Sequence, residues 1–398
     1  MFSRRLKTGY FVLEGLNSFA TTLYFYYFYF FMEKAFGFGN RANLSLAALS
    51  GFFYAAFSLL AGRFTERFGY FTALKIGFFI MLGSVTAGVL LGRAQGAVPW
   101  MIITMSLTVL GMCFTWPALE ALVSSNEDRP GVQHMVGVYN IVWAGTGALA
   151  YFTGGAFLDT FGLNTLFYFP AAIVVVQLAL VFWLETQCQP PIPAPPEQPA
   201  PVPLETSMHL PRRLRSFLRM AWLANPFAYI AINTLVAVVP GLARRFELST
   251  MLAGFFCSLW CFARLGTFIL LWYWTGWHYR FRWLLAAYLT LIITFTAILT
   301  VPNLTVLVCA QLLLGIALGL IYYSSLFYSM DLSDTKGEHG GIHEAAIGFG
   351  NFAGPAIGAA ALALLPQYSN AAAFSVSGVL LLGLGGLLTL WRTGKTGT

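Results

Sequence analysis

Residues 190–211 read PPIPAPPEQPAPVPLETSMHLP and hold nine of the eighteen prolines of the 398-residue chain. Proline cannot donate a backbone hydrogen bond, whereas lipid leaves no backbone polar group unsatisfied. This stretch is therefore expected in water, as a linker of polyproline type. Strongly apolar sequence lies on both sides of it. The sequence predicts two units, residues 1–186 and 218–398, joined by a linker over residues 187–217.

The composition of the chain excludes a water-soluble globular protein. Hydrophobic residues make up 58% of it and charged residues only 9%, against roughly a quarter charged residues in soluble chains. A bilayer crossing needs about 20 apolar residues. Runs of that length occur near residues 10–33, 42–62, 72–92, 98–122, 135–157, 164–186, 218–242, 250–275, 283–301, 305–330, 344–366 and 371–391. The fold class predicted is an all-α membrane protein with twelve transmembrane helices.

The two units repeat short segments of sequence. The segment RRLK at residues 4–7 recurs as RRLR at 212–215, and at the same offset of 208 Asn17 recurs as Asn225. A second match, at an offset of 209, relates the fifth and eleventh spans. These offsets indicate a duplicated six-helix unit. Parallel repeats of this kind build transporters that rock two halves about a central site.

The distribution of basic residues predicts the orientation in the membrane. With the N-terminus inside, sixteen Lys and Arg residues fall on the inner side and five on the outer side, which predicts that both termini are cytoplasmic. The first apolar run is too long for a signal-peptide core and is expected to remain as an anchor. We expect an integral protein of the bacterial inner membrane. The net charge of +7 then reflects this orientation, and no nucleic acid partner is expected.

The loop after the second span carries a recognisable motif. Residues 62–69 read GRFTERFG, which resembles the G-x-x-x-[DE]-R-x-G loop of the major facilitator superfamily through Gly62, Glu66, Arg67 and Gly69. The resemblance implies two six-helix bundles that alternate access to a central site, with Glu66 and Arg67 helping to close the cytoplasmic side. Where the family motif continues with basic residues, this chain has Tyr70 and Phe71. The alternative is an ordinary basic loop that obeys the positive-inside rule.

The eleventh span contains four small or helix-bending residues at regular spacing. Gly350, Gly354, Pro355 and Gly358 look like the glycine-proline motif of the family's antiporters, although in that family the motif belongs in the fifth span. The favoured alternative is close helix packing, since small residues let membrane helices approach one another.

The resemblance further implies that spans one, four, seven and ten line the central cavity. Polar residues at helical spacing share one face on each of these spans. The substrate-cavity candidates on them are Asn17, Thr21, Tyr24, Asn225, Tyr229, Asn233, Gln311 and Tyr322. The alternative is hydrogen bonding between helices without a substrate, which contributes about 0.6 kcal/mol per contact.

Charges inside the spans are functional candidates because each costs from about 2.5 to above 10 kcal/mol in lipid. Arg264 is the only basic residue deep in a span, and we expect it to face a substrate anion or to pair with a carboxylate. Glu14, Glu120 and Glu344 lie near the cytoplasmic ends of their spans and are proton-coupling candidates, with capping or snorkelling as the alternative. Glu14 and Glu344 are the first partners to consider for Arg264.

These features predict a secondary active transporter that moves a small solute, coupled to protons, and not an enzyme. There is no phosphate-cradling motif for ATP, and no cofactor or metal site is expected. Two alternatives remain: a membrane sensor derived from a transporter, for which the short C-terminal tail leaves no signalling domain, and a polytopic membrane enzyme, for which the five scattered histidines offer no catalytic cluster. The expected partners are the solute, protons and the lipid bilayer, with the protein a monomer.

Overall fold

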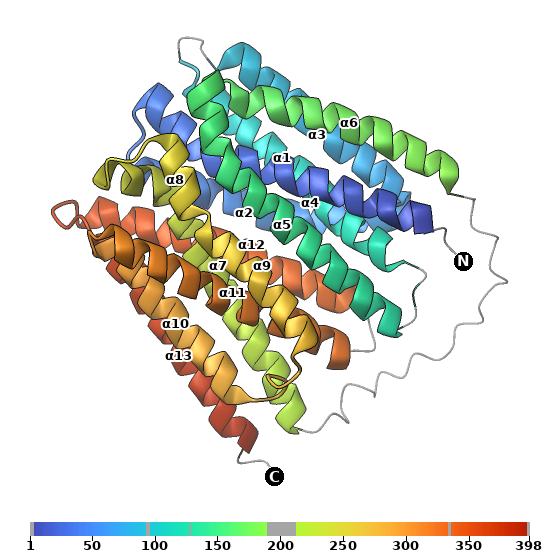
Figure 1. The fold of residues 1–398 in the computed structure, drawn as a ribbon, viewed down its shortest axis with the longest axis vertical. Helices are drawn as coiled ribbons and strands as arrows, with labels where there is room; N and C mark the ends of the chain where they lie inside the picture. The colour runs from blue at the N-terminus through green and yellow to red at the C-terminus, as the bar shows by residue number, and fades with distance from the viewer. Residues whose placement is uncertain are drawn as a thin grey trace.

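The computed structural model describes residues 4–92, 96–125, 127, 129–188, 212–332 and 336–395. These residues form thirteen α-helices (Figure 1). The first half contains α1 (Arg4–Phe36), α2 (Asn40–Phe68), α3 (Tyr70–Leu91), α4 (Val98–Ser124), α5 (Arg129–Phe161) and α6 (Thr165–Gln187). The second half contains α7 (Arg212–Arg245), α8 (Thr250–Cys257), α9 (Leu259–Tyr273), α10 (Phe281–Thr300), α11 (Leu304–Leu332), α12 (Lys336–Leu364) and α13 (Ala371–Lys395). Most of the predicted linker, residues 189–211, lies outside the described residues.

Eleven of the predicted spans coincide with helices that are long and apolar enough to cross a membrane, within the described part of the chain. Helices α8 and α9 together make one of them, Thr250–Tyr273, interrupted at Ser258. The first predicted span, α1, is not among the eleven. It mixes apolar residues with charged, hydroxyl and amide side chains, most of which are enclosed by other helices. With α1 as the twelfth, the all-α membrane fold predicted from the sequence is confirmed.

The helices associate as two groups that lie side by side (Figure 1). Within the first half, α1 contacts α5 and α6, and α3 contacts α4 and α6. Within the second half, α7 contacts α11, α12 and α13, and α9 contacts α11. The beginning of α1 and the end of α13 lie at the same face of the molecule, which we call the termini face. The opposite face, where α1 ends and α8 begins, is called the distal face.

The halves meet through two equivalent pairs of helices. Helix α12 packs on α2, and α5 packs on α8 and α9. Moving six spans along the chain converts the first pair into the second, as expected of a duplicated unit facing its copy. Glycines make both approaches close: an ideal Cβ on Gly155 of α5 would lie 2.9 Å from Met251 Cα, and one on Gly348 of α12 would lie 2.9 Å from Ala55 Cα. Backbone therefore lies against backbone at both seams.

Candidate functional site

A cavity with about 1330 Å³ of empty volume, open space included, lies between the two halves. Its walls come from α1, α2, α4 and α5 of the first half and from α7, α9, α11 and α12 of the second. Each half thus contributes four helices. A change in the angle between the halves would change the shape of this cavity.

Six of the residues singled out in the sequence line this cavity. They are Thr21, Tyr229, Asn233, Tyr322, Arg264 and Glu120. The four spans expected at the cavity therefore all reach it, through α1, α4, α7 and α11. On the wall of the second half, Asn233 Nδ2 donates to Asn351 Oδ1 at 2.5 Å and to the Tyr229 carbonyl at 3.1 Å. The hydrogen bond between Asn233 and Asn351 thus extends the polar wall from α7 onto α12.

The other described candidates do not line the cavity. Asn17, Tyr24, Asn225, Gln311 and Glu14 are enclosed, each at most 1% exposed, and none is among the residues that line it. Their polar stripes run along helix faces that also meet neighbouring helices. Tyr24, for example, lies 5.2 Å from Phe28 and 6.2 Å from Phe167 between ring centroids. Four of them, Asn17, Tyr24, Asn225 and Gln311, were expected at the cavity, and that role stays a prediction, because helical spacing gives a shared face but not its direction.

Several cavity residues were missed from the sequence, most of them aromatic. They are Phe25, Tyr26, Tyr29, Tyr54, Trp116, Tyr139, Trp143 and Asn351. Aromatic side chains also suit a lipid-facing surface, so their type alone does not distinguish the two positions. Trp143 had one available signal: it directly precedes the Ala144-Gly145 pair that matches residues 353–354 in the repeat.

The guanidinium of Arg264 lies over two indole rings, one from each half. Its Cζ lies 4.6 Å from the ring centroid of Trp143 on α5 and 4.8 Å from that of Trp260 on α9. The residue is 7% exposed, and its buried Nε has no hydrogen-bond acceptor in the described part of the chain. The guanidinium is thus fixed in position by stacking and not by an ion pair.

No carboxylate of the described residues lies within ion-pair distance of Arg264. The expected partner Glu14 does not reach it, since both Glu14 oxygens are enclosed without a hydrogen-bond partner. The other expected partner, Glu344, has its side chain outside the described residues. Two cation–π contacts supply about 0.5–2 kcal/mol each, less than the upper estimates for a charge in lipid. Access to the cavity, for water or an anion, is what makes this charge tolerable.

The Trp143 ring is itself fixed by neighbours in both halves. Its Nε1 donates to Asn140 Oδ1 at 2.8 Å, and its ring lies 6.2 Å from Trp116 and 5.6 Å from Tyr322. Trp116 also lines the cavity, and its buried Nε1 has no acceptor within the described chain. Two donors without an acceptor in the described chain, Arg264 Nε and Trp116 Nε1, therefore belong to residues that contact the Trp143 ring.

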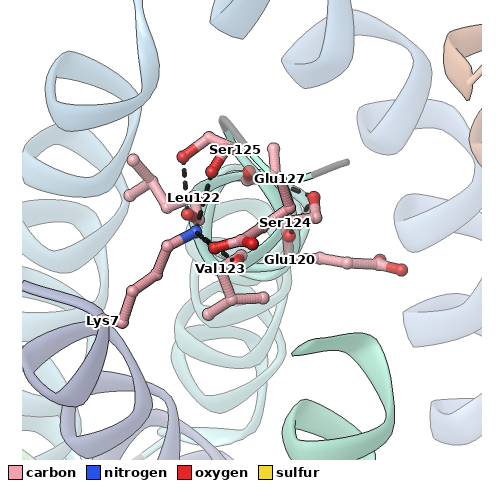
Figure 2. Close-up of polar contacts among 8 residues, drawn as sticks. Lys7, Glu120, Leu122, Val123, Ser124, Ser125 and Glu127 are labelled. Atoms are coloured by element: carbon pink, nitrogen blue, oxygen red, sulfur yellow. Dashed lines mark hydrogen bonds and ion pairs between the residues drawn. The ribbon is translucent and has the colours of Figure 1, made fainter. Parts of the chain in front are cut away.

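Lys7 closes the end of α4 at the termini face (Figure 2). Its Nζ donates to the carbonyls of Val123 and Ser125, both at 2.7 Å, and forms an ion pair with Glu127 at 3.2 Å. A lysine suits this place because the last carbonyls of a helix carry partial negative charge. The Glu120 side chain points away from this cluster, as Figure 2 shows. Lys7 is thus committed to Glu127 and the end of α4.

Glu14 and Glu120 form an acidic pair beside the cavity. Glu14 of α1 is fully enclosed, and it lies near enough to Glu120 of α4 and Tyr139 of α5 for electrostatic interaction. Glu120 and Tyr139 line the cavity, whereas Glu14 is not among its lining residues. Two of the three proton-coupling candidates thus lie near one another at the cavity.

Charged side chains join the two halves at the distal face. Glu33 of α1 forms an ion pair with Arg244 of α7. Lys34 of α1 contacts Asp159 of α5 at 3.3 Å and donates to Thr250 Oγ1 of α8. These contacts draw α1, α5, α7 and α8 together beyond the cavity.

One further bond at the distal face uses the first turn of α8. The backbone N–H of Met251 donates to Asp159 Oδ2 at 2.8 Å. A carboxylate at the N-terminus of a helix is stabilised by the free amide groups there. Asp159 therefore ties the end of α5 to the beginning of α8.

The motif at residues 62–69 lies where α2 turns into α3. Gly69 separates the two helices with φ +87°, a left-handed conformation that favours glycine, and its N–H donates to the Thr65 carbonyl at 2.9 Å. Glu66 and Arg67 are exposed, and neither forms an ion pair with a described residue. Gly62 has no neighbour within 4 Å of an ideal Cβ. The closing role of Glu66 and Arg67 therefore stays a prediction about another state of the protein.

The glycines of α12 lie where this helix crosses α7. An ideal Cβ on Gly350 would lie 2.6 Å from Tyr229 Cβ, and one on Gly354 would lie 2.6 Å from Thr234 Oγ1. Gly358 faces Leu44, with 3.2 Å to its Cδ1, and Pro355 lies within the helix. Close packing explains these glycines without any appeal to antiport.

Comparisons with known proteins agree with this architecture. The solved structure of the POT family transporter PepTSo is similar with a TM-score of 0.78 at 12% identity, over 100% of both chains. The nucleoside transporter NupG gives a TM-score of 0.69 at 13% identity, over 97% of this chain and 99% of that one. A bacterial homolog of the human lysosomal transporter Spinster, solved in an inward-facing and unoccupied conformation, gives 0.66 at 13% identity, over 98% and 95%. At such identities the likeness shows the fold alone.

No curated protein matches the chain. The sequence pattern of the Major Facilitator Superfamily, however, matches residues 10–355. This match covers most of both halves, so it does not depend on the loop at residues 62–69 alone. The chain therefore belongs to the Major Facilitator Superfamily.

Proposed function

We propose that this protein is a secondary active transporter that carries a small solute through the cavity by alternating access, coupled to protons. The observation that carries the proposal is a cavity to which each half contributes four helices, with Arg264 and Glu120 among its lining residues. Family membership supports it, as do the similar structures, which are of transporters. A sensor or a membrane enzyme has no comparable observation in its favour.

The state of the structure fits one end of a transport cycle. Polar contacts of Glu33, Lys34 and Asp159 close the distal face, while Glu66 and Arg67 at the termini face are exposed. Exposed ion pairs contribute about 0.2–1 kcal/mol each, so a few of them can hold a state that a bound solute later shifts. The distribution of basic residues predicts cytoplasmic termini, and with that orientation this state corresponds to the inward-open end of the cycle.

Proton coupling is assigned to Glu14 and Glu120. The two carboxylates interact electrostatically, so a proton carried by either one would relieve the repulsion between them. Release of that proton becomes favourable when movement of α1 or α4 admits water to the enclosed Glu14. The proton and the solute thus use neighbouring parts of one cavity.

The test is transport by the purified full-length protein in liposomes. We would measure uptake of a mixed metabolite set by mass spectrometry, with and without an imposed pH gradient, and expect at least one solute to accumulate only with the gradient. A double variant Glu33→Cys/Arg244→Cys, in a background without the five native cysteines, would then be cross-linked with a bifunctional methanethiosulfonate, which forms a disulfide with each cysteine, releases sulfinate and is cleaved by a reducing agent. Cross-linking should stop uptake and cleavage should restore it.

The control is the same protein treated with a monofunctional thiol reagent, which modifies both cysteines without joining the halves. Uptake that continues at the same rate in the cross-linked protein would contradict alternating access at this seam. Absence of uptake for every solute, in protein that still binds one of them, would identify a sensor and overturn the proposed function.

A further inference from the structure

The cavity contains a fixed positive charge that no described carboxylate neutralises. Arg264 lines the cavity, is 7% exposed and has no ion-pair partner among the described residues. Arginine cannot shed its proton to escape burial. The residue that most needs a counter-ion thus faces the space that a solute would enter.

The stacked geometry leaves the guanidinium able to bind an anion. Arg264 Cζ lies 4.6 Å from the ring centroid of Trp143 and 4.8 Å from that of Trp260. These contacts use the ring faces, so they do not occupy the N–H groups of the guanidinium. Guanidinium N–H groups lie in the plane of the group and match the two oxygens of a carboxylate. Because Nε has no acceptor in the described chain, at least one donor awaits a partner.

The other walls of the cavity favour a flat solute. Nine aromatic side chains line it, including Phe25, Tyr26 and Tyr29 of α1. Aromatic rings pack favourably against one another with their centroids about 4.5–7 Å apart. Trp116, whose ring centroid lies 6.2 Å from that of Trp143, has a buried Nε1 without an acceptor in the described chain. This N–H offers a donor to a second oxygen on such a solute.

The negative charge in the cavity is placed away from Arg264. Glu120 lines the same cavity but forms no ion pair with Arg264, and it interacts with Glu14. An anion at Arg264 and a proton on the acidic pair would together cross the membrane without net charge. This arrangement favours an anionic solute over a cationic one.

We propose that the solute is a small aromatic carboxylate whose carboxylate binds Arg264 beside Trp143 and Trp260. This inference rests on the proposed function for its biological meaning, but its binding step does not require transport. Benzoate is the simplest probe of this class. Benzamide has the same ring without the charge, and inorganic phosphate has charge without the ring.

The experiment measures thermal unfolding of the full-length protein in detergent with sodium benzoate, benzamide or sodium phosphate, at matched ionic strength. A ligand stabilises the folded state in proportion to its occupancy. We expect benzoate to raise the unfolding temperature in a saturable way, with benzamide and phosphate at least about tenfold weaker, as the loss of one charge-assisted interaction implies.

Three variants complete the test. Arg264→Gln should abolish the benzoate shift, Arg264→Lys should weaken it because the paired geometry is lost, and Arg280→Gln, which removes an exposed arginine outside the cavity, should leave it unchanged. If Arg264→Gln does not fold, the comparison of benzoate with benzamide on the unmodified protein still shows whether binding requires the negative charge. Equal shifts with both probes, a shift that survives Arg264→Gln, a shift with phosphate alone, or no shift at all would overturn the inference.

The binding result and the transport result can fail independently. Benzoate binding without transport of any solute would contradict the proposed function and leave the anion site standing. Transport of a solute that lacks negative charge, unaffected by Arg264→Gln, would retain the proposed function and remove the anion site.

Discussion

Trp143 of the first half lies over the guanidinium of Arg264 in the second half, with 4.6 Å between Cζ and the ring centroid. This contact crosses the cavity between units that must move relative to one another in alternating access. Trp260, whose ring the guanidinium also lies over, belongs to the same helix as Arg264. Trp260 therefore moves together with Arg264, whereas the contact between Arg264 and Trp143 changes when the halves rock.

This asymmetry predicts different results for the two tryptophans. Trp143→Leu should raise the KM for the solute by about 2-fold to 30-fold, the range of a partly or fully desolvated cation–π contact, and should alter the rate of conformational change. Trp143→Phe should retain much of the affinity. Uptake kinetics in liposomes would measure both. Trp183→Leu, at an exposed position on α6, is the control, and an equal effect there would show a general loss of fold.

Removing the acid at Glu14 should separate binding from energy coupling. Glu14→Gln keeps the shape but cannot carry a proton, so solute exchange should continue while accumulation driven by a pH gradient disappears. Parallel measurements of exchange and accumulation would show this. Glu247→Gln, in the exposed loop before α8, should accumulate solute normally. Undiminished accumulation by Glu14→Gln would move the coupling role to Glu120 or elsewhere.

The ion pair between Glu33 and Arg244 should bias the protein toward the state described. Glu33→Gln should shift the equilibrium toward the distal-open state by up to about fivefold, the effect of an exposed pair worth at most about 1 kcal/mol. The rate of maleimide labelling at Val236→Cys, a cavity position on α7, would report the shift. The exchanged pair Glu33→Arg/Arg244→Glu should restore the labelling rate measured with the native pair. Failure to restore it would rule out a simple charge contact.

The seam between α5 and α8 should tolerate no added atom. Gly155→Ala places a Cβ 2.7 Å from the Thr250 carbonyl carbon, and such overpacking costs about 1–3 kcal/mol. We expect a lower unfolding temperature and slower uptake. Gly266→Ala, on α9 with open space around it, should instead be neutral or stabilising by up to about 1 kcal/mol through helix propensity. Identical effects of the two changes would remove the argument from close packing.

The exposed motif at residues 62–69 yields a test of function without a change in stability. Glu66→Ala or Arg67→Ala should shift the unfolding free energy by no more than about 0.5 kcal/mol, as at other exposed positions, yet reduce uptake. Arg63→Ala, an exposed neighbour on the same helix, should preserve uptake. Normal uptake by both motif variants would leave the loop with a role in orientation only.

The fold could be predicted from the sequence because it depends on quantities that the sequence states directly. Twelve runs of sufficient length, one proline-rich divider and a repeated segment are enough to predict two six-helix units. The motif added the family, which the match over residues 10–355 then confirmed.

The site could be predicted only in part because it depends on how each helix is rotated. Thr21 and Tyr24 are three residues apart on α1, yet Thr21 lines the cavity and Tyr24 packs against Phe28 and Phe167. The rotation of α1 follows from its contacts with α4, α5 and α6, which lie too far along the chain for local spacing to reveal. The stacking of Trp143 on Arg264 likewise joins helices from different halves and has no local signature.

The polar character of α1 has a consequence for biosynthesis. This helix precedes the other described helices in the chain and is not among the eleven described segments that are long and apolar enough to cross a membrane, and the side chains of Asn17, Tyr24 and Tyr27 are enclosed in the folded protein. Two of the helices that enclose it, α5 and α6, begin at Arg129 and Thr165. The enclosure of the polar face of α1 is therefore complete only when α5 and α6 have been inserted, and chains shortened before α5 should leave Asn17, Tyr24 and Tyr27 more exposed than they are in the full-length protein.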